Sequence, residues 1–308
     1  MLAVVLSGGG NRGAIEAGAL VALFERGIQP QMFVGTSAGA LNATFMALNP
    51  TLDGARLLAQ TWGKVKQKDV FPGNGLTYLW RFITGADSLA SNANLRRFIE
   101  ARLPRGVSTF GDIKGARLYI TTANLNTAEL FLFGDDPGAS LVYAVLCSAA
   151  APPFLPPIAL NGWQFSDGAV VANVPVSVAV SKGATEVYAI DVGIGGLRRQ
   201  EIHGVVDIVR RAVGVMEHQQ LTDDLDDVWK GGDVTLHYLP IHTLADIGDF
   251  NHAKQFVAEG YRVMNDFLDG KPPVLPTIQA KPSTAPPGAT HWVRRGRKRD
   301  ERGVGSRE

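Results

Sequence analysis

The sequence predicts an α/β fold built on a mainly parallel β-sheet. The chain opens with an apolar run at residues 2–6 that is rich in Val and Leu, as expected for a strand buried on both faces. A helical stretch at 14–26 follows, and then come a second strand at 31–34 and a second helix at 38–48. This strand–helix–strand–helix order is typical of parallel sheets with right-handed crossover connections.

The chain continues with the same kinds of element up to residue 270. Its periodicity predicts helices at 52–65, 92–102, 140–151, 205–221 and 252–268. It predicts strands at 118–123, 129–133, 163–165, 186–191 and 234–239, the first two joined by a polar turn. We therefore expect one domain over residues 1–270.

Residues 271–308 differ from the rest of the chain in composition. They are Pro-rich and then basic, with nine Lys/Arg and three Asp/Glu, whereas residues 1–270 hold 21 Lys/Arg and 26 Asp/Glu. Such a segment buries little apolar surface, so we expect an extended or disordered tail. A solvated tail is the favoured interpretation, and contact with an anionic membrane surface is the alternative. The mildly acidic body does not indicate specific binding of nucleic acid.

The cysteine count and the lengths of the apolar runs limit the predicted cofactors and cellular location. The single cysteine, Cys147, excludes an internal disulfide and a cysteine-only metal site, and no zinc or calcium pattern is present, so we expect no metal and no cofactor. The apolar start is too short for a signal peptide, and no run of about 18 apolar residues is present. These features predict a cytoplasmic protein, with peripheral membrane contact as the alternative, and leave the oligomeric state undetermined.

The second predicted strand ends in the string Gly35-Thr36-Ser37-Ala38-Gly39, and a helix follows at once. A G-x-S-x-G string between a strand and a helix is typical of a nucleophile elbow, which exposes the serine hydroxyl on a sharp turn. The flanking glycines are needed because a side chain would block so tight a turn. Ser37 is therefore a candidate nucleophile, and the alternative is a helix entry with a Ser or Thr cap.

The first predicted strand is followed by Gly8-Gly9-Gly10-Asn11-Arg12-Gly13. This string satisfies the G-x-G-x-x-G pattern of dinucleotide sites, but the acidic residue expected at the end of the second strand is absent. Consecutive glycines beside a helix N-terminus can also direct backbone N–H groups at an anion. Beside a serine elbow that anion would be a tetrahedral oxyanion, with Gly9 and Gly10 as donors and Arg12 as a helper. The alternative for Arg12 is an ordinary surface residue.

A third string, Ser166-Asp167-Gly168-Ala169, follows the predicted strand at 163–165. An Asp-Gly pair alone is most often a turn, but a serine nucleophile needs a base. The usual base is a histidine, and the order Ser…Asp…His of an α/β-hydrolase triad is available. The six histidines all follow Asp167, and none has a distinctive context: His203, His218, His237, His242, His252 and His291.

The three strings together, in this order, resemble the signatures of patatin-like phospholipases over residues 2–190. Two further stretches, at 148–157 and 173–175, are also similar to that family. The resemblance implies a three-layer sandwich and a Ser-Asp dyad without histidine, in which Ser37 is the nucleophile and Asp167 the base. It also implies an oxyanion hole formed by the glycine loop: Gly8, Gly9, Gly10, Arg12 and Gly13. Ala169 stands where many members have Gly, and Gly168 and Ala169 complete the third signature.

The implied function is a serine acyl hydrolase that cleaves ester bonds of lipids through an acyl-enzyme. The expected partner is a lipid or other ester, and its acyl chain needs an apolar groove, for which the aromatic-rich segment 70–89 is the candidate wall. Two alternatives stay open. One is an esterase with a Ser-His-Asp triad, and the other is a nucleotide-binding module that uses residues 8–13 for phosphate.

Overall fold

A computed structural model describes residues 1–70, 87–193, 201–231, 233–241 and 250–271. The strands are β1 (Leu2–Leu6), β2 (Met32–Gly35), β3 (Arg117–Asn124), β4 (Glu129–Phe133), β5 (Ile158–Leu160), β6 (Trp163–Asp167), β7 (Glu186–Asp191) and β8 (Thr235–Pro240). The described residues form one eight-stranded sheet in the order β5-β6-β3-β2-β1-β7-β8, and β4 pairs with β3. Neighbours from β3 to β8 along this order are parallel, which confirms the mainly parallel sheet.

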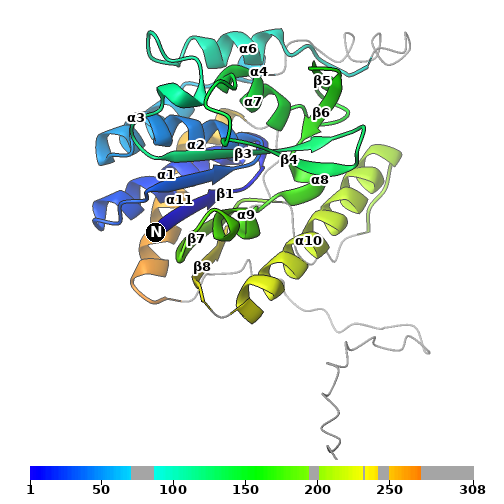
Figure 1. Ribbon diagram of the computed structural model, residues 1–308. Coiled ribbons are helices and arrows are strands. Elements are labelled where there is room, and N and C mark those ends of the chain that lie inside the picture. The colour runs from blue at the N-terminus through cyan, green and yellow to red at the C-terminus, as the bar shows by residue number, and fades with distance from the viewer. Residues whose placement is uncertain (71–86, 194–200, 232, 242–249, 272–308) are drawn as a thin grey trace, which may run out of the picture. The chain divides into compact units, whose positions relative to one another are not determined.

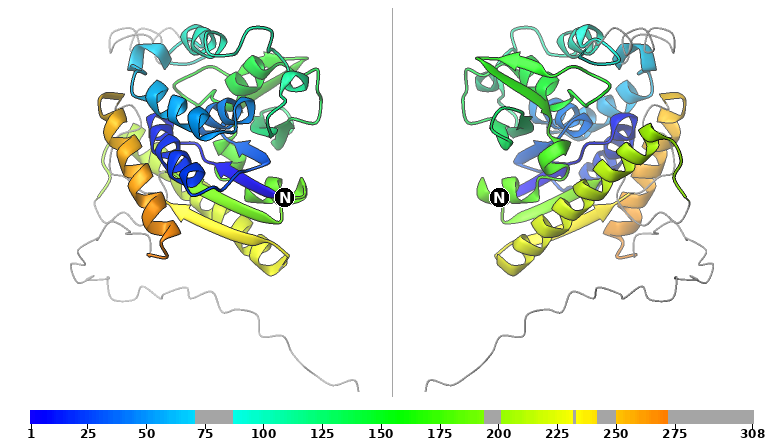
Figure 2. Two further views of the ribbon diagram at one scale, coloured as in Figure 1. Left: turned by 90° about the vertical axis from the view of Figure 1, so that its left-hand side faces the viewer. Right: turned by 90° about the vertical axis from the view of Figure 1, so that its right-hand side faces the viewer.

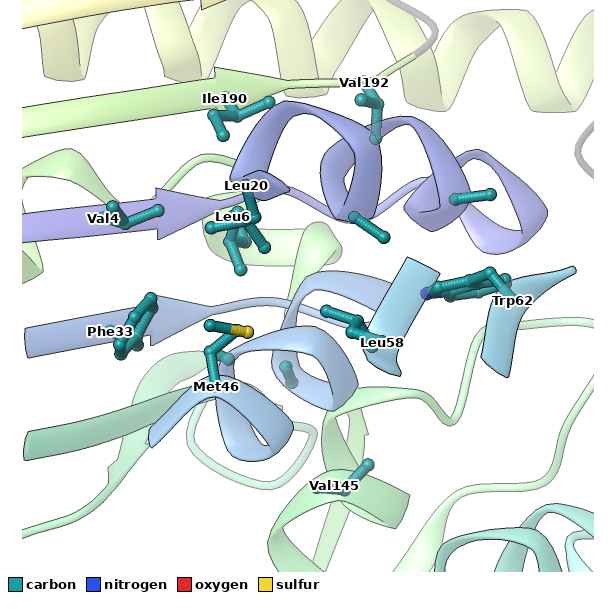
Figure 3. Close-up of a cluster of buried hydrophobic side chains, with 14 of the residues drawn as sticks. Val4, Leu6, Leu20, Phe33, Met46, Leu58, Trp62, Val145, Ile190 and Val192 are labelled. Atoms are coloured by element: carbon teal, nitrogen blue, oxygen red, sulfur yellow. The ribbon is translucent and has the colours of Figure 1, made fainter. Parts of the chain in front are cut away.

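The central strand β1 is buried on both faces. Alternate residues of a strand point to opposite faces of the sheet. Val4 and Leu6 enter one hydrophobic cluster and Ala3 and Val5 enter the other, and all four are fully buried. Figure 3 shows the first cluster, where Phe33 of β2 lies beside the β1 side chains. Two-sided burial requires helices on both faces of the sheet.

Helices cover both faces and give three layers, as Figure 1 and Figure 2 show. The first cluster packs against α1 (Gly13–Glu25), α2 (Ala38–Leu48), α3 (Leu52–Trp62), α6 (Ala93–Glu100), α7 (Leu141–Ser148) and α11 (Ala253–Leu268). The second cluster packs against α9 (Val176–Ser181) and α10 (Val205–Gly231). The shorter helices are α4 (Gln67–Val70), α8 (Ala169–Ala172), η1 (Gly10–Arg12), η2 (Phe110–Asp112) and η3 (Phe250–His252). The predicted three-layer sandwich is confirmed.

Two glycines allow α1 and α11 to approach backbone to backbone. A Cβ atom on Gly18 of α1 would lie 1.9 Å from the Val257 carbonyl oxygen, and one on Gly260 of α11 would lie 1.8 Å from the Ile15 carbonyl oxygen. No side chain fits at such distances, so this crossing depends on glycine at both positions.

The structure differs from the predicted elements in a few places. α10 ends at Gly231 rather than near residue 221, and α9 was not predicted because its Val-Ser-Val-Ala-Val alternation is typical of a strand. Most of segment 70–89 and nearly all of the tail lie outside the described residues, so the proposed groove wall and the domain boundary at residue 270 stay predictions. No helix within the described ranges is both long enough and apolar enough to cross a bilayer.

Candidate active site

Ser37 lies on the sharp turn between β2 and α2. Its φ of 54° and ψ of −118° are strained for a residue with a side chain. The flanking glycines pack too closely for a Cβ: one on Gly35 would lie 2.4 Å from the Gly39 carbonyl oxygen, and one on Gly39 would lie 2.3 Å from the Leu6 carbonyl oxygen. The backbone is therefore tightly packed while the Ser37 side chain stays partly exposed.

The residues around Ser37 hold the turn in place. Thr36 is buried, and its hydroxyl donates to the Ala172 carbonyl at 3.0 Å and lies 2.6 Å from the Thr121 hydroxyl oxygen on β3. The Ser37 N–H donates to the Ser148 Oγ at 2.8 Å, at the end of α7. Nothing in the sequence around Ser148 predicted this particular contact.

Asp167 ends β6, opposite Thr122 of β3, and its carboxyl group is buried beside Ser37. One carboxylate oxygen accepts the Ala169 N–H at 2.9 Å, and the Ser37 side chain lies close enough to the same carboxyl group to lower its pKa. Burial raises the pKa of Asp167 to about 6, although the hydrogen bond from the Ala169 N–H and the nearby Ser37 side chain oppose this rise. The carboxyl group beside Ser37 thus titrates near pH 6.

Gly168 lets the end of β6 approach β3. A Cβ atom on Gly168 would lie 2.4 Å from the Thr121 carbonyl oxygen. The Gly168 N–H also donates to the Ser148 carbonyl at 3.4 Å. Ser148 therefore contacts both the elbow and the Asp-Gly step.

The glycine loop lies directly beside the serine. A Cβ atom on Gly8 would lie 3.2 Å from the Ser37 Cβ, and the Gly8 N–H donates to the side chain of Asn173 at 3.0 Å. In contrast, within the part of the chain that the structure describes, no group accepts the N–H of Gly9 or Gly10, and both residues are partly exposed. Gly10 has a φ of 60°. These two N–H groups are available to a ligand.

Arg12 is buried, which is contrary to the surface alternative. Its guanidinium donates to the Gly9 carbonyl at 3.2 Å and to the Gly193 carbonyl at 3.1 Å. The Gly193 N–H in turn donates to the Asp191 carboxylate at 2.7 Å, at the end of β7. Arg12 therefore ties the glycine loop to the segment that follows β7.

Gly13 and Ala38 lie where the glycine loop meets the elbow. A Cβ atom on Gly13 would lie 3.1 Å from the Ala38 Cβ and 2.6 Å from the Trp62 ring. The Trp62 indole N–H donates to Asn42 of α2 at 2.7 Å, and Asn42 donates to the Gly13 carbonyl at 2.9 Å. This polar network sets the start of α1 against α2.

Glu217 of α10 was not predicted, yet it lies close enough to Asp167 and Arg12 for their charges to act on its pKa. Burial raises the pKa of Glu217 to about 7; the carboxyl group of Asp167 adds to the rise, and the charge of Arg12 opposes it. Gln220, three residues later, donates to the Val170 carbonyl at 3.4 Å, which holds α10 against α8. No sequence signal marks Glu217, because a carboxylate on an amphipathic helix is typical of a solvated face.

The described histidines give no sign of a triad. The Asp167 carboxyl group accepts the Ala169 N–H, and the other group that lowers its pKa is the Ser37 side chain rather than a histidine. His237 lies 3.0 Å from the Glu186 carboxylate at the first residue of β7, and His203 lies 3.6 Å from Glu201. His242 and His291 lie outside the described residues. Among the residues that were searched, no cluster of side chains suited to a metal ion was found.

Comparisons with known proteins match the part of the chain that holds the three strings. A sequence-family profile described as patatin-like phospholipase matches residues 4–180. "Patatin-like phospholipase domain-containing protein 7" of Rattus norvegicus is 32% identical over 197 residues, which cover 62% of this chain and 14% of that protein. "Neuropathy target esterase sws" of Drosophila melanogaster is 30% identical over 195 residues, 62% of this chain and 13% of that protein. This chain therefore matches only a small part of each relative.

A solved structure shows a similar fold. VipD from Legionella pneumophila matches with a TM-score of 0.50 and 16% sequence identity, over 87% of this chain and 66% of that chain. The similar fold therefore covers most of this chain and not only the strings at residues 8–13, 35–39 and 166–169.

Proposed function

Because this chain belongs to the patatin-like phospholipase family, we propose that it is a serine acyl hydrolase that cleaves carboxylic ester bonds of lipids. The position of the buried Asp167 carboxyl group beside the Ser37 side chain carries the proposal. A serine hydroxyl is a weak nucleophile until a base accepts its proton, and Asp167 is in contact with it and titrates near neutral pH.

In the proposed reaction Asp167 takes the proton of Ser37, and the Ser37 Oγ attacks the ester carbonyl carbon. The oxyanion that forms accepts the N–H groups of Gly9 and Gly10, each worth about 3–4 kcal/mol by analogy with other hydrolases. Asp167 then returns the proton to the leaving alcohol and activates water to release the acyl group. The Gly8 N–H already donates to Asn173, and Arg12 donates to the Gly193 carbonyl. We therefore propose that Gly8, Arg12 and Gly13 stabilise the conformation of the glycine loop.

An apolar slot along α2 suits the acyl chain. Its lining includes Leu41, one helical turn after Ser37, and Val145, one turn before Ser148. The remaining apolar lining comes from α2 and the α6 region: Phe45, Leu48, Phe98, Ile99 and Leu103. We propose that this slot holds the acyl chain of the substrate.

Active-site labelling tests the proposal. Ser37→Ala is expected to abolish labelling by a fluorophosphonate and to lower ester hydrolysis by about 10⁴-fold or more. Ser181→Ala, which removes an exposed hydroxyl at the end of α9, should leave both unchanged. Labelling of the Ser37→Ala protein would place the nucleophile elsewhere, and loss of activity in a correctly folded His218→Ala variant would support a triad.

Glu217→Gln is expected to change the alkaline side of the pH profile. In the wild type kcat/KM should rise as Asp167 ionises near pH 6, and fall a few-fold as Glu217 ionises near pH 7, because a new negative charge opposes the oxyanion. In Glu217→Gln, kcat/KM should still rise near pH 6 but should no longer fall near pH 7. The measurement is kcat/KM for a soluble ester from about pH 5 to 9, with Glu259→Gln on α11 as the exposed control. An unchanged alkaline side in Glu217→Gln would contradict this role.

A further inference from the structure

α10 is much longer than the strands it covers. Its 27 residues span about 40 Å, whereas the six residues of β7 span about 20 Å. α10 connects β7 to the parallel strand β8, so it begins at the carboxyl edge of the sheet, where Ser37 lies, and runs back toward the opposite edge. The first half of α10 therefore extends past the catalytic edge, as Figure 1 shows beside α8.

The two halves of α10 are buried to different degrees. In the second half, Leu221, Leu225 and Val228 are buried against the sheet. The first half instead has a stripe of exposed apolar side chains, which we call the α10 stripe: Val205 (78% exposed), Ile208 (52%), Val209 (57%), Val213 (42%) and Met216 (61%). Spacings of three and four residues place these side chains on one face of the helix.

The α10 stripe adjoins the active site. Glu217 follows Met216 directly, and its pKa responds to the charges of Asp167 and Arg12. Gln220 contacts the backbone of Val170, three residues after Asp167. A surface that covers the stripe therefore lies next to the segment that carries Asp167.

We propose that the α10 stripe docks on a phospholipid bilayer and places the entrance of the Ser37 site at the membrane surface. This inference rests on the proposed function, because a lipid ester in a bilayer must reach Ser37 from an apolar phase. An interfacial helix buries its apolar face about 5–10 Å into the boundary between headgroups and acyl chains. The stripe has the apolar side chains that such burial requires.

The charges of α10 favour a zwitterionic surface. By sequence, residues 205–216 carry one Asp and two Arg, whereas residues 217–231 carry five Asp/Glu and one Lys. The docking half has a net charge of only +1, and the acidic half is repelled by anionic lipid. Neither half therefore attracts anionic lipid strongly, so docking depends on apolar burial and is insensitive to salt. This behaviour separates the stripe from the basic tail, which would need anionic lipid and would release it at high salt.

Vesicle binding and hydrolysis by the full chain test the proposal. Wild type is expected to co-sediment with phosphatidylcholine vesicles equally well at about 0.1 and 1 M NaCl. The double variant Val209→Asp/Val213→Asp should bind about tenfold or more weakly and hydrolyse vesicle phospholipid more slowly to a similar extent, while its rate on a soluble short-chain ester stays within about twofold. Leu57→Asp, at a 51% exposed leucine on α3, is the matched control and should behave as wild type.

The outcomes separate this proposal from others. Unchanged binding by the double variant, or binding that needs anionic lipid and disappears at high salt, overturns it. A dimer in solution that the double variant dissociates, without vesicle binding by the monomer, shows instead that the stripe covers a second copy of the chain. Ser37→Ala should bind vesicles normally, so a wild type that binds vesicles but hydrolyses neither ester would refute the proposed function and leave the docking surface standing.

Discussion

Replacement of Asp167 by Asn is expected to lower kcat/KM for every ester by about 10⁴-fold while the fold is kept. Asparagine has the same shape, and its carbonyl can still accept the Ala169 N–H, but its amide cannot take a proton from Ser37. Serine then lacks the base that its attack requires. Asp53→Asn, at a side chain 94% exposed, is the matched control and should keep full activity.

The same substitution is expected to stabilise the protein. The folded pKa of Asp167 is raised from 3.8 to about 6, so its contribution to stability is present below pH 3.8 and is lost as the pH rises through 6. A pKa shift of this size lowers the free energy of unfolding by about 3 kcal/mol above pH 7, compared with its value at low pH. Asp167→Asn should therefore unfold at higher urea concentration than wild type at pH 8, with little difference at pH 3.5. An active Asp167→Asn protein, or one less stable at pH 8, would contradict the assignment of Asp167 as a buried base.

Gly260→Ala is expected to destabilise the fold by about 3 kcal/mol or more, the upper part of the range for overpacked sites. The new Cβ would lie 1.8 Å from the Ile15 carbonyl oxygen, so α11 must separate from α1. The better helix propensity of Ala returns only about 1 kcal/mol. The measurement is the free energy of unfolding in urea.

Gly63→Ala is the matched control for this effect. Gly63 follows α3 with a φ of −62°, and the nearest atom to its added Cβ would be 3.5 Å away. This variant should unfold at the same urea concentration as wild type or a slightly higher one. Equal stability of Gly260→Ala and Gly63→Ala would show that α1 and α11 do not need the backbone contact. Because α1 starts at Gly13 of the glycine loop, a separated α11 should also lower esterase activity.

Local sequence patterns were sufficient for much of the fold. The apolar run of β1, the helix at residues 38–48 and the strand at residues 186–191 match the structure closely, because periodicity and glycine placement act over a few residues. α9 and residues 222–231 of α10 were not predicted. Their helical state comes from packing against the second hydrophobic cluster rather than from local pattern.

In the candidate site, too, local patterns identified some residues, and only the folded structure revealed their contacts. Ser37 and the glycines around it could be identified from the sequence because a strand, a sharp turn and a helix constrain neighbouring residues. The tertiary structure alone placed Ser148 on the Ser37 N–H, 111 residues away, and Asn173 on the Gly8 N–H, 165 residues away. It also buried Arg12 and brought Glu217 close enough to Asp167 and Arg12 for their charges to act on its pKa. The sequence by itself determined the turns that carry the chemistry, whereas only the folded sheet decided their partners, because those contacts join strand ends that are distant along the chain.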